Sequence, residues 1–233
     1  MTLLYTGKTK DVYSHGPNTY EIKFTDRVTL NDAGEIDPGG NNTSNLLLEG
    51  QGFACLSMTA AIFDYLARNG IPTHMVSYDL SKLSMIVRQA STFRPGLEWV
   101  CRWKATGSYV RRYNSVPGME DGMKLPFPVH EITLKDDAKG DPMIVPDSIV
   151  ALNMISKDQL DELIDLNART MDLLHVFFRQ KGLDLWDIKI EWGQDAETGQ
   201  LLLIDEVSAN GCRAFDSSGE RVTGHALSAC FQS

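Results

Sequence analysis

The sequence predicts an α+β fold with antiparallel sheets, because candidate strands come in runs that two long helices interrupt. The helices are expected over residues 44–69 and 157–181, and runs of strands precede, separate and follow them. A regular alternation of strand and helix, which would favour a parallel doubly wound sheet, does not occur. There are also no internal repeats that would indicate a solenoid or a propeller.

The composition is ordinary for a globular protein of one large unit or of two lobes that share a cleft: 233 residues, 42% hydrophobic and 23% charged. No apolar run approaches the ~20 residues of a membrane span. Residues 1–13 lack the features of a signal peptide, so we expect a cytoplasmic protein. The four cysteines are widely spaced, which predicts free thiols. The net charge of −9 argues against nucleic-acid binding but leaves room for small anionic substrates at a local basic cluster.

Local signals place the two helices. Ser156 and Gln159 form a predicted capping box before the helix at 157–181, and Gly182 follows its end. The helix at 44–69 would begin at Thr43 or Ser44 and end before Gly70. Residues 26–43 precede it as a long polar loop, and such loops are often functional.

A predicted hairpin over residues 186–207 carries the strongest functional signal. In its first strand Asp187, Lys189 and Glu191 share one face, and the partner strand ends in Asp205 and Glu206. Carboxylates beside a lysine suit a Mg²⁺–nucleotide site, because Mg²⁺ takes one or two carboxylates plus phosphate oxygens. A solvated face with cross-strand ion pairs is an equally good interpretation.

Two further segments are candidates for binding anions. A strand that contains Arg102 runs into Gly107 and Ser108 at the start of a short helix, where free N–H groups and a hydroxyl could bind an anion. An ordinary helix cap with surface arginines would look the same. Lys8 and Lys10 flank a turn that could lie over nucleotide phosphates, although the spacing is not that of a Walker A loop and a basic β-turn is the simpler interpretation.

Taken in order, these segments resemble the SAICAR synthetase (phosphoribosylaminoimidazole-succinocarboxamide synthase) family over about residues 4–216. The matching segments are residues 7–13, 70–74, 102–108, 135–137 with 140–142, 187–193, and 205–208 followed by Arg213. The resemblance implies a two-lobed fold with an ATP cleft between the lobes. Residues 1–80 would form an N-terminal lobe with the phosphate-contacting loop and a long helix, and residues 81–233 an ATP-grasp-like lobe with the Mg-ATP and substrate site.

The resemblance also implies a reaction and a set of residues. ATP and Mg²⁺ would activate the carboxylate of carboxyaminoimidazole ribonucleotide (CAIR), which the α-amine of L-aspartate then attacks. The implied ATP-binding residues are Lys8, Lys10, Lys189, Glu191 and Asp205, of which Glu191 and Asp205 would hold Mg²⁺. The implied substrate-binding residues are Asp32, Arg102, Ser108, Asn210 and Arg213, and the implied catalytic residues are Lys189, Arg102 and Asp205. The expected partners are small molecules, with no nucleic acid or membrane, and a homo-oligomer is left open.

At three positions the chain differs from the residues usual in this family. Asn210 stands for an aspartate, Gln51 for a lysine and Cys55 for an asparagine. These differences favour a second hypothesis, a paralogous carboxylate–amine ligase with another acid or amine. A third hypothesis, a nucleotide-binding protein without ligase activity, is disfavoured because the chain retains Lys189, Glu191, Asp205, Arg102 and Ser108.

Overall fold

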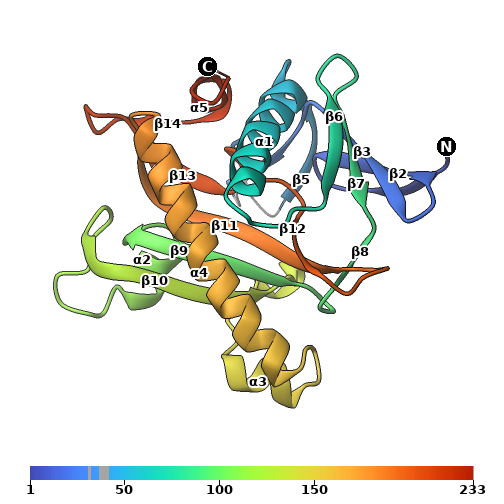
Figure 1. The fold of residues 1–233 in the computed structure, drawn as a ribbon. Coiled ribbons are helices and arrows are strands. Elements are labelled where there is room, and N and C mark those ends of the chain that lie inside the picture. The colour runs from blue at the N-terminus through green and yellow to red at the C-terminus, as the bar shows by residue number, and fades with distance from the viewer. Residues whose placement is uncertain (31–32, 37–41, 233) are drawn as a thin grey trace.

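The computed structural model describes residues 1–30, 33–36 and 42–232, so Asp32 lies outside the described residues. In this part of the chain two large antiparallel sheets lie next to each other and two long helices cover them (Figure 1). This arrangement confirms the predicted α+β class with antiparallel sheets and long helices.

The N-terminal sheet has five strands in the order β1-β2-β3-β7-β6. Its strands are β1 (Leu3–Thr6), β2 (Lys10–Gly16), β3 (Thr19–Phe24), β6 (Met75–Asp79) and β7 (Ser84–Arg88). A separate pair, β4 (Arg27–Leu30) and β5 (Asn42–Leu47), occupies part of the predicted loop. Strand β7 pairs with β3 and β6, so this sheet continues past residue 80. The division of the chain into two lobes at residue 80 stays a prediction.

The second sheet has seven strands and carries most of the polar residues discussed below. Its main path is β10-β9-β11-β13-β14, and both β12 and β8 pair with β11. The strands are β8 (Ala90–Thr92), β9 (Leu97–Lys104), β10 (Lys124–Leu134), β11 (Asp184–Asp195), β12 (Leu201–Ile204), β13 (Cys212–Phe215) and β14 (Arg221–Val222). The predicted hairpin is therefore confirmed as β11–β12, and it lies at the centre of the sheet.

Helix α4 (Lys157–Gln180) crosses the second sheet, as Figure 1 shows, and begins as predicted. The Ser156 hydroxyl accepts from the Gln159 N–H, and the Gln159 side chain accepts from the Ser156 N–H. The indole N–H of Trp192 on β11 donates to the Asn167 side chain of α4 at 3.1 Å. The apolar stripe of the helix is thus buried against the apolar face of the sheet.

Helix α1 (Gln51–Arg68) begins at Gln51, so the prediction of a start at Thr43 or Ser44 was wrong. Residues Asn42–Leu47 form strand β5 instead, and Gly50 then turns the chain with a φ of 81°. The Asp26 carboxylate accepts from the Gly52 N–H at 2.9 Å and so caps the first turn. The remaining helices are short: α2 (Ser108–Tyr113), the 3₁₀ turn Asp137–Lys139, α3 (Pro146–Ala151) and α5 (Gly224–Ala229).

One hydrophobic core runs through both sheets and both long helices. The segment after α1 joins the sheets directly: Leu203 N–H donates to Pro72 C=O, and His74 N–H donates to Leu203 C=O, both at 2.9 Å. The two sheets are therefore held in a fixed relation along the cleft between them. None of the helices in the described ranges has the length and apolarity that crossing a membrane requires.

Candidate active site

Two pockets adjoin each other where the two sheets meet. The lysine pocket lies between the sheets and is lined by Lys8, Lys10, Lys135, Glu191, Asp205 and Glu206, among others. The arginine pocket lies farther along the second sheet and is lined by Arg102, Ser108, Arg111, Arg112, Arg213 and Arg221, among others. Glu98, Lys189, Asn210 and Gly211 line both pockets, and we call these four residues the shared wall. A group bound in one pocket therefore lies next to the other pocket.

The ionisable face of β11 forms ion pairs with β9 and with Lys135, the residue that follows β10. Lys189 Nζ lies 2.7 Å from Glu98 Oε1, and Arg102 Nη1 lies 2.6 Å from Asp187 Oδ2. Glu191 pairs with Lys135 in the same way. The predicted cross-strand ion pairs are present, and the same side chains line the two pockets, so a Mg²⁺–nucleotide site at this face stays a prediction.

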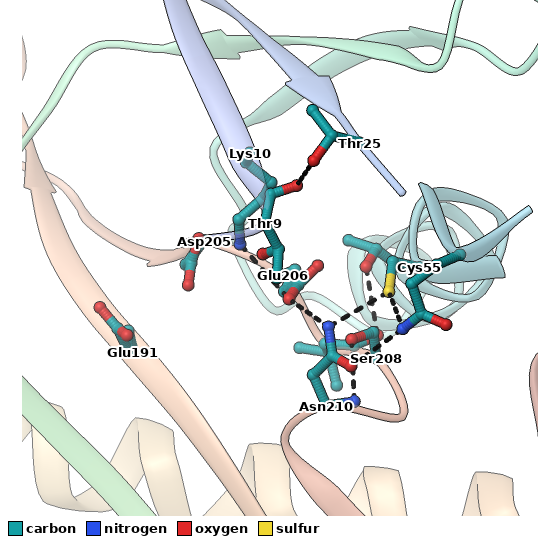
Figure 2. Close-up of polar contacts among 12 residues, drawn as sticks. Thr9, Lys10, Thr25, Cys55, Glu191, Asp205, Glu206, Ser208 and Asn210 are labelled. Carbon is teal, nitrogen blue, oxygen red and sulfur yellow. Dashed lines mark hydrogen bonds and ion pairs between the residues drawn. The ribbon is translucent and has the colours of Figure 1, made fainter. Parts of the chain in front are cut away.

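In the lysine pocket each lysine faces a carboxylate. Lys10 Nζ lies 2.5 Å from Asp205 Oδ1 and 3.4 Å from Glu206 Oε1 (Figure 2). Burial alone would lower the pKa of Lys10, but the charges of Asp205 and Glu206 outweigh burial and raise it above its ordinary value. Burial would likewise raise the pKa of Asp205, but the neighbouring Lys10 and Lys135 hold it well below its usual range. Both groups are therefore charged at neutral pH.

The backbone of Asp205 is in the left-handed region, with a φ of 64°. Few residues other than glycine adopt this conformation, and Asp and Asn are among those that do. The buried ring of His74 supports it, because Nε2 lies 3.2 Å from the carbonyl oxygen of Asp205. Burial lowers the pKa of His74 to about 4, so the ring is neutral at pH 7 and can donate one N–H to that carbonyl.

The carboxylates of the lysine pocket fit a divalent cation that nucleotide phosphates help to hold. Among the described residues there is no group of three or more side chains that could hold a metal by itself. Glu191 and Asp205 do line the same pocket, and burial together with the charge of Asp205 raises the pKa of Glu191. A cation between the two would relieve that repulsion. Two carboxylates that leave other positions open match the ligand preference of Mg²⁺.

Arg102 is the centre of the arginine pocket and is itself only 4% exposed. Its guanidinium donates to Glu131 Oε2 at 2.7 Å, to Asp187 at 2.6 Å and to Ser108 Oγ at 3.0 Å. Arg213 Nη1 also lies 2.6 Å from Asp187 Oδ2, and its side chain is 34% exposed. Arg102 thus organises the pocket from beneath, while Arg213 presents its charge to whatever binds there.

Gly107 allows Arg213 to approach the start of α2. Its φ is 57°, and a Cβ at this position would lie 2.7 Å from Arg213 Nη2. The expected turn between β9 and α2 is therefore also a contact surface for the arginine. This contact could not be predicted from the sequence, because residues 107 and 213 belong to distant segments.

The structure brings together all of the site residues predicted from the sequence that lie in its described ranges. Each of them lines one of the two pockets or the shared wall. No site role was predicted from the sequence for Glu98, Lys135, Asp137, Glu131, Arg112 or Arg221, although residues 135–137 belong to a segment that resembles the family. Glu98 could have been found, because in a strand it shares a face with Arg102 four positions later. Asp137, which pairs with Lys8 at 2.8 Å, gave no local signal of its role.

The α+β scaffold carries a lysine-lined pocket suited to nucleotide phosphates beside an arginine-lined pocket suited to a second anion. This combination is typical of an enzyme that transfers a group between a nucleotide and a second substrate. The model of the SAICAR synthetase family matches residues 3–227. A phosphoribosylaminoimidazole-succinocarboxamide synthase of Clostridium tetani is 38% identical over 215 residues, which are 92% of each chain. The chain therefore belongs to the SAICAR synthetase family.

Solved structures agree with this assignment. A SAICAR synthetase in complex with ADP superposes with a TM-score of 0.82 at 26% identity, over 94% of this chain and 87% of the other. The synthase of Ehrlichia chaffeensis gives 0.83 over 95% and 88%, and at 24% identity it supports the fold alone. The expected family, fold and ligase class are confirmed, and these findings do not favour the alternative of a paralogue with changed substrates.

Proposed function

We propose that this chain joins the carboxylate of CAIR to the α-amine of L-aspartate, with ATP converted to ADP and phosphate. The names of its relatives support the reaction, and the ADP complex of one relative supports nucleotide binding. The observation that carries the proposal for the site is the shared wall. It joins a pocket lined by lysines and carboxylates to one lined by arginines, which supports binding of a triphosphate in the first and of a phosphorylated, carboxylated substrate in the second.

In the lysine pocket Lys8, Lys10 and Lys189 would neutralise the phosphates of ATP. Mg²⁺, when bound, would supply charge neutralisation between the γ-phosphate and the incoming carboxylate. Glu191 and Asp205 would hold it, which requires that their present partners, Lys135 and Lys10, turn toward the phosphates. The pocket would thus exchange protein ion pairs for lysine–phosphate and carboxylate–metal contacts.

In the arginine pocket Ser108 and Arg213 would bind the 5′-phosphate or the carboxylate of the imidazole nucleotide. Arg102 would keep both of them in position through its bonds to Ser108 and to Asp187. Asp32, proposed near the imidazole ring on the resemblance, lies outside the described residues. Arg111 and Arg221 extend the same positive surface.

The reaction would proceed in two steps that balance without a nucleophilic side chain. The substrate carboxylate takes the γ-phosphoryl group and releases ADP, and the amine of aspartate then displaces phosphate with loss of a proton. Catalysis would come from positioning and charge neutralisation. Cys212 is not suited to act as a nucleophile, because burial and the charge of Asp187 raise the pKa of its thiol.

An ADP-release assay with purified protein tests the proposal. Release should require CAIR, L-aspartate and Mg²⁺ together. Lys189→Ala and Glu191→Ala should lower it by at least about 100-fold with the fold retained, whereas Lys157→Ala, at an exposed lysine of α4, should not. Turnover only with another amine would instead support the paralogue, and binding of nucleotide without turnover would exclude a ligase.

A further inference from the structure

Gln51, Cys55 and Asn210 come from two distant parts of the chain and lie in one hydrogen-bonded group. Gln51 Nε2 is 3.1 Å from Asn210 Oδ1, and Asn210 Nδ2 is 3.2 Å from Cys55 Sγ. The same Nδ2 is 3.2 Å from Glu206 Oε1 (Figure 2). Gln51 and Cys55 begin helix α1 and are each 4% exposed, whereas Asn210 belongs to the shared wall.

We propose that Gln51, Cys55, Asn210 and Glu206 form one positioning cluster that fixes the shared wall. The cluster requires that the side chains at positions 51 and 210 are either both uncharged or oppositely charged. The proposal rests on the proposed function only for its effect on turnover. In it Asn210 acts through the wall, as a positioning residue.

The bonding of Asn210 fixes its orientation. Its amide oxygen accepts from the amide of Gln51, and its NH₂ group donates to two acceptors, the Glu206 carboxylate and the Cys55 sulfur. Burial and the charge of Glu206 raise the pKa of the Cys55 thiol to about 12, so the sulfur is uncharged at neutral pH. The cluster thus adds no charge to that of Glu206.

The carboxylate of Glu206 in the cluster is only partly neutralised, because it shares Lys10 with Asp205. Glu206 Oε1 lies 3.4 Å from Lys10 Nζ, and Lys10 already pairs with Asp205. An aspartate at position 210 would place a carboxylate beside that of Glu206 and remove the donor to Glu206, while Lys10 is already shared between Glu206 and Asp205. A lysine at position 51 would supply the missing positive charge at the place where the Gln51 amide now donates.

The cluster reaches the reacting groups through the backbone. Gly211, the next residue, accepts from the Lys189 N–H at 2.8 Å, and a Cβ on Gly211 would lie 3.1 Å from the Lys189 carbonyl oxygen. A shift of Asn210 would therefore move Gly211 against Lys189, and both line the two pockets. The Asn210 side chain is bonded to Gln51, Cys55 and Glu206 and not to Lys10, Glu191 or Asp205, so nucleotide binding should change less than turnover.

The experiment is a double-mutant cycle on the full chain with Asn210→Asp, Gln51→Lys and the double variant. Asn210→Asp should lower kcat by at least about tenfold, with the Kd for ADP–Mg²⁺ changed less than about threefold, and the double variant should recover most of the loss. Asn153→Asp and Gln180→Lys introduce the same charges at exposed positions away from both pockets and should leave turnover unchanged.

Independent effects of the two substitutions, with no recovery in the double variant, would overturn the proposal. If Asn210→Asp does not fold, Gln51→Met, which removes the donor and keeps the length, should still lower kcat by about threefold or more. An unchanged kcat in that variant would also overturn it. If the wild type shows no aspartate-dependent turnover, the proposed function fails, and the same cycle measured in melting temperature still decides whether positions 51 and 210 are coupled.

Discussion

Lys10 and Asp205 are separated by 195 positions in the chain, and their side chains meet with Nζ 2.5 Å from Oδ1. One comes from β2 of the N-terminal sheet, and the other directly follows β12 of the second sheet. The ion pair therefore spans the cleft between the two sheets. Before a ligand binds, each of the two residues neutralises the charge of the other: Asp205 is the carboxylate expected to bind metal, and Lys10 is the lysine expected to bind phosphate.

Asp205→Asn tests the metal role of this carboxylate. Asparagine tolerates the left-handed backbone at this position, so the substitution removes charge with little change in conformation. We expect Mg²⁺ to strengthen ADP binding to the wild type and to do so at least about tenfold less in the variant, because one metal ligand has lost its charge. Calorimetric titration with ADP, with Mg²⁺ and with chelator, measures this. An equal Mg²⁺ effect in both proteins would remove Asp205 from the metal site.

Arg102 and Arg213 should differ in what their loss affects. Arg102→Ala removes the buried partner that Asp187 and Glu131 share and leaves them paired with the partly exposed Arg213 and Arg112, so we expect the free energy of unfolding to fall by about 3 kcal/mol, the lower end for a broken buried ion pair. Arg213→Ala leaves Asp187 paired with Arg102, so stability should change little while KM for the imidazole nucleotide rises. Urea unfolding and steady-state kinetics separate the two. The reverse pattern would exchange the two roles.

Gly107→Ala should weaken the arginine pocket although no charged residue is replaced. The added methyl group would lie 2.7 Å from Arg213 Nη2 and would displace it. Gly118→Ala is a matched control, because Gly118 also has a positive φ but a Cβ there would meet nothing within 4 Å. We expect KM for the imidazole nucleotide to rise about tenfold more in the first variant than in the second. Equal effects would mean that strain alone, and not contact with Arg213, is responsible.

His74 should make stability depend on pH. Its pKa is lowered by burial to about 4 in the folded protein and is about 6.5 when unfolded, so between these values the unfolded chain binds more protons. The free energy of unfolding should therefore fall as pH falls from about 6.5 to about 4, by on the order of 3 kcal/mol. Urea midpoints measured across this range check it. His74→Gln, which keeps a donor for the Asp205 carbonyl, should lack this component, and an unchanged pH profile would contradict the assignment.

The elements with strong local signals were predictable. The Ser156 capping box, the stripe of α4 and the alternation of β11 each depend on residues a few positions apart, and the structure confirms all three. The start of α1 was not, because the strand pairing of β5 with β4 overrides the helical propensity of residues 44–49. The short helix Gly224–Ala229 was missed because its contacts are with α1, far away in the chain.

Many of the residues that line the two pockets could be predicted from the sequence, but the partners of their side chains could not. Lys8, Lys10 and Lys189 could be assigned to phosphate from their residue type and the resemblance. Their carboxylate partners come from other strands and turns, so no spacing in the sequence indicates them. The same holds for Gln51 and Asn210, which read separately as two unrelated differences and lie 3.1 Å apart in the fold.

The shared wall has a consequence for the lifetime of the activated substrate. An acyl phosphate is readily hydrolysed, and any path through solvent between two separate sites would expose it to water. Glu98, Lys189, Asn210 and Gly211 belong to both pockets, so under the proposed function the carboxyl group would be phosphorylated and aminated in one place. Under the proposed function, the intermediate needs no channel and no release step, and the yield of amide per ATP depends on how well these four residues exclude water.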